Sequence, residues 1–179
     1  MSRGVVLWPE DATTRAVSEI WGELAARGLP SCATHTHRRH QPHVSLLVAD
    51  QFPAEEVLAA VGTVPSRPIR LRIESAGVFP GGLLFLACVA NDQLLDEQRR
   101  VTRVAAPLAT GIWPHLTVGG WTPHLTLGWD LRPDQLAAAL PLVLDRLPLT
   151  GWLTCGGVED GDTGQNWTRS GDGMVRTRS

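Results

Sequence analysis

The order of apolar and polar positions along the chain predicts strands and helices in alternation. Apolar runs over residues 4–8 and 83–90 are typical of buried strands, and a strict two-residue alternation over 69–75 indicates a strand with one solvated face. The remaining strands are predicted near residues 31–39, 42–49, 112–118, 122–129, 149–158 and 165–170, and the helices near 9–27, 53–61, 92–109 and 133–147. This mixture of elements predicts an α+β fold.

Local signals refine these elements. Gly119 and Gly120 predict a hairpin between two of the strands, residues 77–82 are predicted as a loop, and the polar tail over 171–179 is expected to fray. The first helix has one apolar face, which we expect in the core, made of Val17, Ile20, Trp21 and Leu24.

Aligning the chain with itself at an offset of about 80 residues reveals an internal duplication. Residues 40–46 fall on 121–127, and each half reads strand, helix, strand, strand, helix, strand. The predicted repeats cover about 4–75 and 84–158 of a single domain over 1–179. Two such halves place two antiparallel sheets side by side, with equivalent strands facing each other across a pseudo-twofold axis.

Composition excludes several kinds of chemistry. The chain contains no Lys and no Tyr, so its 16 basic residues are all Arg. A lysine Schiff base, a P-loop lysine and a tyrosine nucleophile are therefore excluded. An all-Arg set favours bidentate contact with phosphate or carboxylate, but genomic composition is the more ordinary explanation. A formal net charge of −2 argues against a large non-specific nucleic-acid surface.

Cysteine spacing and hydropathy predict the setting in which the protein works. Cys32, Cys88 and Cys155 are odd in number and lack CxxC spacing, which supports neither a disulfide framework nor a zinc ribbon. We expect Cys32 and Cys88 to be small buried apolar residues. The N-terminus lacks the pattern of a signal peptide, and the longest apolar run, over 83–90, is too short to span a bilayer. We therefore expect a cytoplasmic monomer with no membrane partner.

A Pro-His-x-Ser/Thr-Leu motif occurs at both of the places that the duplication aligns. Because side chains i and i+2 of a strand point the same way, His43 shares a face with Ser45, and His124 shares a face with Thr126. A neutral imidazole can accept a proton from water, and an imidazolium can protonate a leaving oxygen. The pattern favours phosphoester chemistry at His43 and His124, with the two hydroxyls binding phosphate and with no cofactor or metal.

These two motifs, about eighty residues apart, resemble those of the 2H phosphoesterase superfamily, specifically the 2′-5′ RNA ligase and RNA 2′,3′-cyclic phosphodiesterase type. The resemblance implies two pseudo-symmetric α+β lobes, with antiparallel sheets flanking a central groove and helices outside. It implies metal-independent opening of a 2′,3′-cyclic phosphate, with 2′-5′ joining in some members, on RNA ends or a small nucleotide. By motif position, His43 and His124 are the acid-base pair, and Ser45 and Thr126 bind the phosphate.

One departure concerns the residues after the second motif. Many relatives have a small residue and then Arg, whereas this chain has Gly128 and Trp129, so a phosphate-binding Arg is missing there. The arginines that can replace it, each more often a solvated charge, are Arg38, Arg39 and Arg132. Trp129 and Phe79 are candidates to stack on a base, although packing is the commoner role of such residues.

Other histidines offer alternative sites. His115 repeats the motif spacing, but the duplication pairs it with His35 and pairs His124 with His43, so His124 is the preferred catalytic residue. His115 is then expected on the neighbouring strand, as a substrate-facing or partly exposed group. His35 and His37 have the spacing of a zinc pair, but the adjacent arginines oppose a dication and favour an exposed polar strand.

Several questions stay open at the level of the sequence. Glu74 and Glu159 lie at the ends of equivalent strands and are interpreted as surface charges. Pseudo-symmetry makes the two motif histidines look alike, so the sequence does not say which is the acid and which is the base. A non-catalytic nucleotide-binding module is the alternative function, and a His-cluster metallohydrolase is a weaker one.

Overall fold

The computed structural model describes residues 2–34, 39–169 and 175–178 of the chain. Its strands are β1 (Arg3–Pro9), β2 (Val44–Gln51), β3 (Ile69–Phe79), β4 (Leu83–Cys88), β5 (Thr110–Ile112), β6 (His124–Gly128), β7 (Leu149–Asp160), β8 (Asn166–Arg169) and β9 (Val175–Arg178). Its α-helices are α1 (Asp11–Ala26), α2 (Ala54–Val61), α3 (Asp92–Ala105) and α4 (Pro133–Leu144), and its short 3-10 helices are η1 (Ala106–Leu108) and η2 (Pro114–Leu116).

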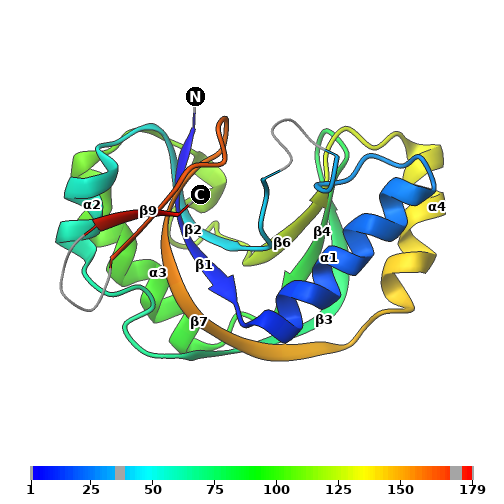
Figure 1. The fold of residues 1–179 in the computed structure, drawn as a ribbon, viewed down its shortest axis with the longest axis horizontal. Coiled ribbons are helices and arrows are strands. Elements are labelled where there is room, and N and C mark those ends of the chain that lie inside the picture. The colour runs from blue at the N-terminus through cyan, green and yellow to red at the C-terminus, as the bar shows by residue number, and fades with distance from the viewer. Residues whose placement is uncertain (1, 35–38, 170–174, 179) are drawn as a thin grey trace.

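Over the described residues, nine strands form one antiparallel sheet, which confirms the predicted α+β fold (Figure 1). The strand order is β5-β2-β1-β7-β3-β4-β6, and β8 pairs with β7 and with β9. The two sheets expected from the duplication are thus joined along their common edge. The pair of β8 and β9 includes residues 175–178 of the tail for which the sequence predicted fraying.

Strands β3 and β7 join the two halves by crossing between them. Their first residues pair with each other around Leu71 and Gly151, which are 80 residues apart, and this register matches the offset of the duplication. Beyond this crossing, β3 continues against β4 of the second half, while β7 continues against β1 of the first half. Each half therefore completes the sheet of the other.

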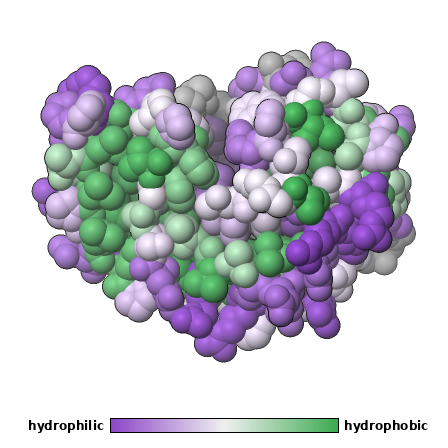
Figure 2. Space-filling view, turned by 180° about the vertical axis from the view of Figure 1, so that it is seen from behind, coloured by the Kyte–Doolittle hydropathy of each residue, from purple (hydrophilic) through white to green (hydrophobic). Residues whose placement is uncertain are grey.

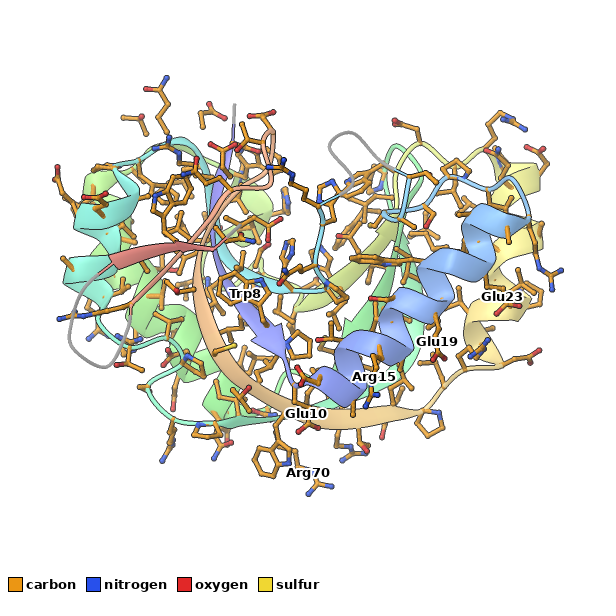
Figure 3. All side chains as sticks on the ribbon, in the orientation of Figure 1. Trp8, Glu10, Arg15, Glu19, Glu23 and Arg70 are labelled. Atoms are coloured by element: carbon orange, nitrogen blue, oxygen red, sulfur yellow. The ribbon has the colours of Figure 1, made fainter. Side chains whose placement is uncertain are left out.

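Helices cover the two ends of this sheet in pairs. In Figure 1, α2 and α3 lie together on the left, and α1 and α4 lie together on the right. The predicted apolar face of α1 is confirmed, because the residues buried on this helix include Val17, Ile20, Trp21 and Leu24. Figure 3 shows Glu19 and Glu23 on the side of α1 toward α4, and both form ion pairs with Arg146, which follows α4.

The outer surface of α4 is apolar. Leu144 is half exposed, and Leu136, Leu140 and Leu142 are only partly buried against the core. Figure 2, seen from behind, shows hydrophobic residues gathered over the half of the molecule that carries this helix. None of the described helices is both long and apolar enough to cross a membrane.

Two regions differ from the predictions, and a third is described only in part. The strand expected over 112–118 ends at Ile112, because Pro114 lacks a backbone N–H for a sheet and instead begins η2, so there is no hairpin at Gly119. The loop expected over 77–82 is strand β3 up to Phe79, with a tight turn after it. The edge strand expected over 31–39 begins with a turn at residues 32–34, and residues 35–38 lie outside the described part.

Candidate active site

Both motifs lie where the polar face of a strand meets a cavity. His43 directly precedes β2, which contains Ser45, and His124 and Thr126 both lie in β6. The intervening residues are fully buried in the core, as the two-residue alternation predicts: Val44, Leu46, Leu125 and Leu127. The backbone thus presents each imidazole and its hydroxyl on the side that faces away from the core.

The two motifs meet in one cavity of about 360 Å³ between the lobes. Its lining includes His43 and Ser45 from the first half and His124 and Thr126 from the second. These four side chains, which are far apart in the sequence, therefore share one solvent-accessible space. The cavity is large enough for a mononucleotide-sized ligand.

Equivalent backbone contacts orient the two imidazole rings. His43 Nδ1 lies 2.8 Å from the carbonyl oxygen of Gln41, and His124 Nδ1 lies 2.7 Å from the carbonyl oxygen of Thr122. A carbonyl can only accept, so Nδ1 carries a proton in each ring and donates it. In both neutral rings the lone pair is therefore on Nε2, the atom that remains for proton transfer with a substrate.

Indole N–H groups fix the backbone of both motifs. Trp21 Nε1 donates to the carbonyl oxygen of Thr126 at 3.0 Å, and Trp121 Nε1 donates to that of Ser45 at 2.9 Å. The thiol of Cys32 donates to the same Thr126 oxygen at 3.3 Å. Thr126 lies on the edge strand β6, and the pairing of β5 with β2 runs from Ala49 to Gln51, beyond Ser45, so these donors reach carbonyl groups from the open side of each strand.

The chain after α1 runs close to the end of β6. The backbone N–H of Cys32 donates to the carbonyl oxygen of Leu127 at 2.9 Å. A Cβ atom on Gly128 would lie 2.4 Å from the carbonyl oxygen of Pro30, which is too close for any other residue. Gly128 is thus required for this approach.

Burial raises the thiol pKa of both Cys32 and Cys88, and this burial agrees with the sequence prediction.

The surroundings of His43 contain a buried carboxylate. Glu159, on β7, is only 4% exposed, and its Oε2 lies 3.2 Å from His43 Nδ1, while its Oε1 lies 3.9 Å from His40 Nδ1. The interpretation of Glu159 as a surface charge is therefore wrong. Glu74 is half exposed and pairs with Arg72, in agreement with that interpretation. Glu159 lies between β1 and β8 in the sheet, paired with Gly4 and Asn166, and the segment of His40 and His43 lies beside its side chain.

The surroundings of His124 are aromatic instead. Its ring centroid lies 5.0 Å from that of Phe79, in an edge-to-face arrangement, and 5.2 Å from that of Phe85. Burial lowers the pKa of His124 below its usual 6.5, and the nearby His43 and His115 lower it further, while its hydrogen bond to Thr122 acts in the opposite direction. His124 is therefore held in its neutral form over a wider pH range than a solvated histidine.

The candidate substrate-facing residues are only partly brought together. His115 and Trp129 line the cavity. Phe79 ends strand β3, where a loop was expected, and its ring packs against His124. His115 lies on η2 and not on the strand that the sequence predicted, and its ring contacts that of Trp113 at a centroid distance of 5.7 Å. Arg38, His35 and His37 lie outside the described residues.

The remaining candidate cations and metal ligands can be placed in part. Arg132 forms an ion pair with Asp134 at the start of α4. Within residues 2–34, 39–169 and 175–178, no group of three or more His, Cys, Asp or Glu side chains is arranged to hold a metal ion.

Sequence reasoning missed three residues that shape the site: Glu159, Trp21 and Trp121. The duplication contains a signal for the first, because Glu159 lies 80 residues after Phe79, so a carboxylate and an aromatic ring occupy corresponding positions. The two tryptophans are indistinguishable from core residues in the sequence, since only the fold shows which carbonyl groups they reach.

Comparisons with known proteins concern the family and the fold of the chain. The family model of the 2′-5′ RNA ligase superfamily matches residues 9–158. A crystal structure of a phosphoesterase aligns with a TM-score of 0.59 at 14% identity, covering 98% of this chain and 92% of the other. None of the curated proteins matches the chain.

Two further solved structures have the same fold. E. coli LigT complexed with 3′-AMP aligns with a TM-score of 0.54 at 14% identity, covering 98% of this chain and 94% of LigT. The protein TT0787 of Thermus thermophilus aligns with a TM-score of 0.53 at 16% identity, covering 100% of this chain and 96% of that protein.

Proposed function

Because the chain belongs to the 2′-5′ RNA ligase superfamily, within the 2H phosphoesterases, we propose that it is a metal-independent phosphodiesterase. Its substrate would be a 2′,3′-cyclic phosphate, which it opens, or a 2′-5′ phosphodiester, which it cleaves or joins, in RNA or a small nucleotide. The observation that carries this proposal is the convergence of His43 and His124 on one cavity, each with Nδ1 bound to a backbone carbonyl and Nε2 left for chemistry.

Paired imidazoles can carry both proton transfers of the reaction. One neutral Nε2 accepts the proton of the attacking water or hydroxyl, while the other ring, as imidazolium, protonates the leaving oxygen. Ser45 and Thr126 stand two residues after each histidine and line the same cavity, so their hydroxyls can donate to non-bridging phosphate oxygens as negative charge builds there.

Aromatic residues at the edge of the cavity support a nucleotide as the substrate. Trp113 is 38% exposed and lines the cavity next to His115, and Trp129 lines it next to His40. Exposed indoles can stack on a base whatever its identity. E. coli LigT, which shares this fold, was crystallised with 3′-AMP, and a ligand of that size suits the cavity here.

A turnover assay tests the proposal. The purified protein is incubated with 2′,3′-cyclic nucleotides and with 2′-5′ dinucleotides, and the monophosphate product is followed over time. We expect His43→Ala and His124→Ala each to lower kcat by about 10²–10⁴-fold with an unchanged circular dichroism spectrum. The matched control is His115→Ala, which removes a histidine from the same cavity and should retain most of the activity.

Two outcomes would contradict the proposal. Binding of these nucleotides without any turnover would favour a non-catalytic module. Loss of activity with EDTA and its recovery with zinc would favour a metallohydrolase, whereas we expect a chelator to leave the rate unchanged.

A further inference from the structure

The two catalytic histidines have the same backbone contacts but different neighbours. The difference originates at one pair of corresponding positions, Phe79 and Glu159, which are 80 residues apart at the ends of the two crossing strands β3 and β7. Phe79 pairs with Leu83 of β4, and Glu159 pairs with Gly4 of β1, so each lies beside the first strand of one repeat. The duplicated frame therefore places a phenyl ring at one histidine and a carboxylate at the other.

A buried carboxylate favours a cation beside it. Glu159 Oε2 lies 3.2 Å from His43 Nδ1, and the low exposure of Glu159 leaves little water to screen the attraction. The carbonyl oxygen of Gln41 accepts the proton on Nδ1, while Glu159 Oε2 lies at ion-pair distance from the same nitrogen and acts on the ring through its charge. When the ring also carries a proton on Nε2, the resulting positive charge faces a negative partner.

Other titratable groups bear on His43 as well. Among the described residues, His40 from the same segment, His124 from β6, His115 from η2 and Asp162 after β7 line the cavity together with Glu159. His40 shares the carboxylate of Glu159 at the longer distance of 3.9 Å. A protonated His40 or His115 would repel an imidazolium. Glu159 and Asp162 both carry a charge of the supporting sign, and Glu159 is the carboxylate that forms an ion pair with His43.

The environment of His124 has the opposite effect. Phe79 stacks on Phe85 with a centroid distance of 4.2 Å, and both rings pack against His124. Apolar rings cannot replace the water that would solvate an imidazolium, so they favour the uncharged ring. His124 Nδ1 donates to a backbone carbonyl, whereas His43 Nδ1 faces a carboxylate as well as its carbonyl.

We infer that Glu159 is a positioning residue that makes His43 the general acid, while Phe79 leaves His124 as the general base. This assignment rests on the proposed function. It deepens that function by giving each histidine its own role, which the pseudo-symmetric motifs alone leave undecided.

The assignment gives a balanced reaction for a 2′,3′-cyclic phosphate. Water attacks phosphorus, and His124 Nε2 accepts the proton of that water as the new P–O bond forms. The P–O3′ bond breaks with its electron pair on O3′, which receives the proton from His43 Nε2. The product is a 2′-phosphate with a free 3′-hydroxyl, and proton exchange with solvent returns both rings to their starting states.

A substrate with a better leaving group tests the assignment. In a 2′,3′-cyclic phosphate whose bridging O3′ is replaced by sulfur, the leaving thiolate needs no proton because a thiol is a far stronger acid than an alcohol. His43→Ala should lower kcat/KM about 10²–10⁴-fold on the oxygen substrate, and sulfur should restore it to within about tenfold of the wild type. His124→Ala should stay impaired on both substrates.

A second measurement isolates Glu159. In Glu159→Gln, loss of the carboxylate removes the attraction for an imidazolium at His43. We therefore expect the alkaline limb of the kcat/KM–pH profile to move to lower pH by about one unit, which is a tenfold loss at a fixed pH on that limb. The acidic limb should stay in place. Glu74→Gln, the exposed carboxylate on β3, is the matched control and should move neither limb.

The outcomes separate this inference from the proposed function. If the wild type turns over none of the phosphodiesters, the proposed function and the assignment fall together. If the wild type is active but sulfur rescues His124→Ala instead of His43→Ala, only the assignment falls. The assignment also falls if Glu159→Gln folds and leaves the alkaline limb unmoved. A melting curve shows whether this variant folds. If it does not fold, the sulfur comparison alone tests the assignment.

Discussion

The carbonyl oxygen of Thr126 offers a sharp test of how the site is held together. Two donors share it: Trp21 Nε1 at 3.0 Å and Cys32 Sγ at 3.3 Å. Trp21 is 5% exposed and Cys32 is 2% exposed, so water does not readily replace either donor. Removing one of them leaves the carbonyl with the other, whereas removing both leaves a partly buried acceptor without either.

The expected free-energy changes follow from that arrangement. Trp21→Phe keeps an aromatic ring but loses one hydrogen bond and some volume, which should lower the free energy of unfolding by about 1–2 kcal/mol. Cys32→Ala removes a weaker donor and should cost about 1 kcal/mol. In the double variant the unsatisfied carbonyl should add about 1 kcal/mol or more beyond the sum of the single changes.

Urea denaturation of the wild type, the single variants and the double variant measures this coupling. Each kcal/mol should also lower the melting temperature by about 2–4 °C in a chain of this size. The matched control is Trp121→Phe, whose indole donates to Ser45 and not to Thr126, so its combination with Cys32→Ala should be additive within about 0.5 kcal/mol. Equal coupling for the two tryptophans would refute the shared-acceptor argument.

Three further predictions concern catalysis. Because the pKa of His124 is lowered, its neutral form persists below pH 6.5, so the acidic limb of the kcat/KM–pH profile should lie below that value. An acidic limb above pH 6.5 would contradict the role of His124 as the base. Phe79→Ala admits water to the His124 ring and should raise its pKa toward 6.5, which NMR titration would show as a shift of the ring resonance midpoint to higher pH. Ser45→Ala and Thr126→Ala should each lower kcat/KM about 10–10²-fold, which is less than the loss expected for either histidine variant. A loss larger than that of the histidine variants would argue against a phosphate-binding role for these hydroxyls.

Much of the fold could be predicted because it depends on local patterns that the duplication repeats. The alternation of Ile69, Leu71 and Ile73 with exposed residues is confirmed on β3, and Pro133 begins α4 as the first helical residue. The motif strands β2 and β6 also lie where the sequence placed them, because their buried and polar positions alternate around each motif.

The errors have physical causes that a periodicity does not capture. The apolar and Thr-containing run after Ile112 has strand propensity, but Pro114 ends β5 and turns the chain into η2, which moves His115 off the sheet. Glu159 has the charge of a surface residue, but it lies between β1 and β8 and beside His43, which is more than a hundred residues earlier in the chain. Contacts between segments far apart in the sequence, which no local window contains, decide the neighbours of the two histidines.

The exchange of β3 and β7 between the halves has a consequence for how such a site can specialise. Two separate copies of one half-length chain could assemble the same sheet by exchanging this strand, but every position would then be identical on both sides of the axis. Both histidines would face phenyl rings, or both would face carboxylates. Joining the halves in one polypeptide lets a single codon change alter one side alone, as Phe79 and Glu159 illustrate. Covalent linkage thereby allows the two histidines to have different neighbours and different roles, which a symmetric pair of identical chains cannot encode.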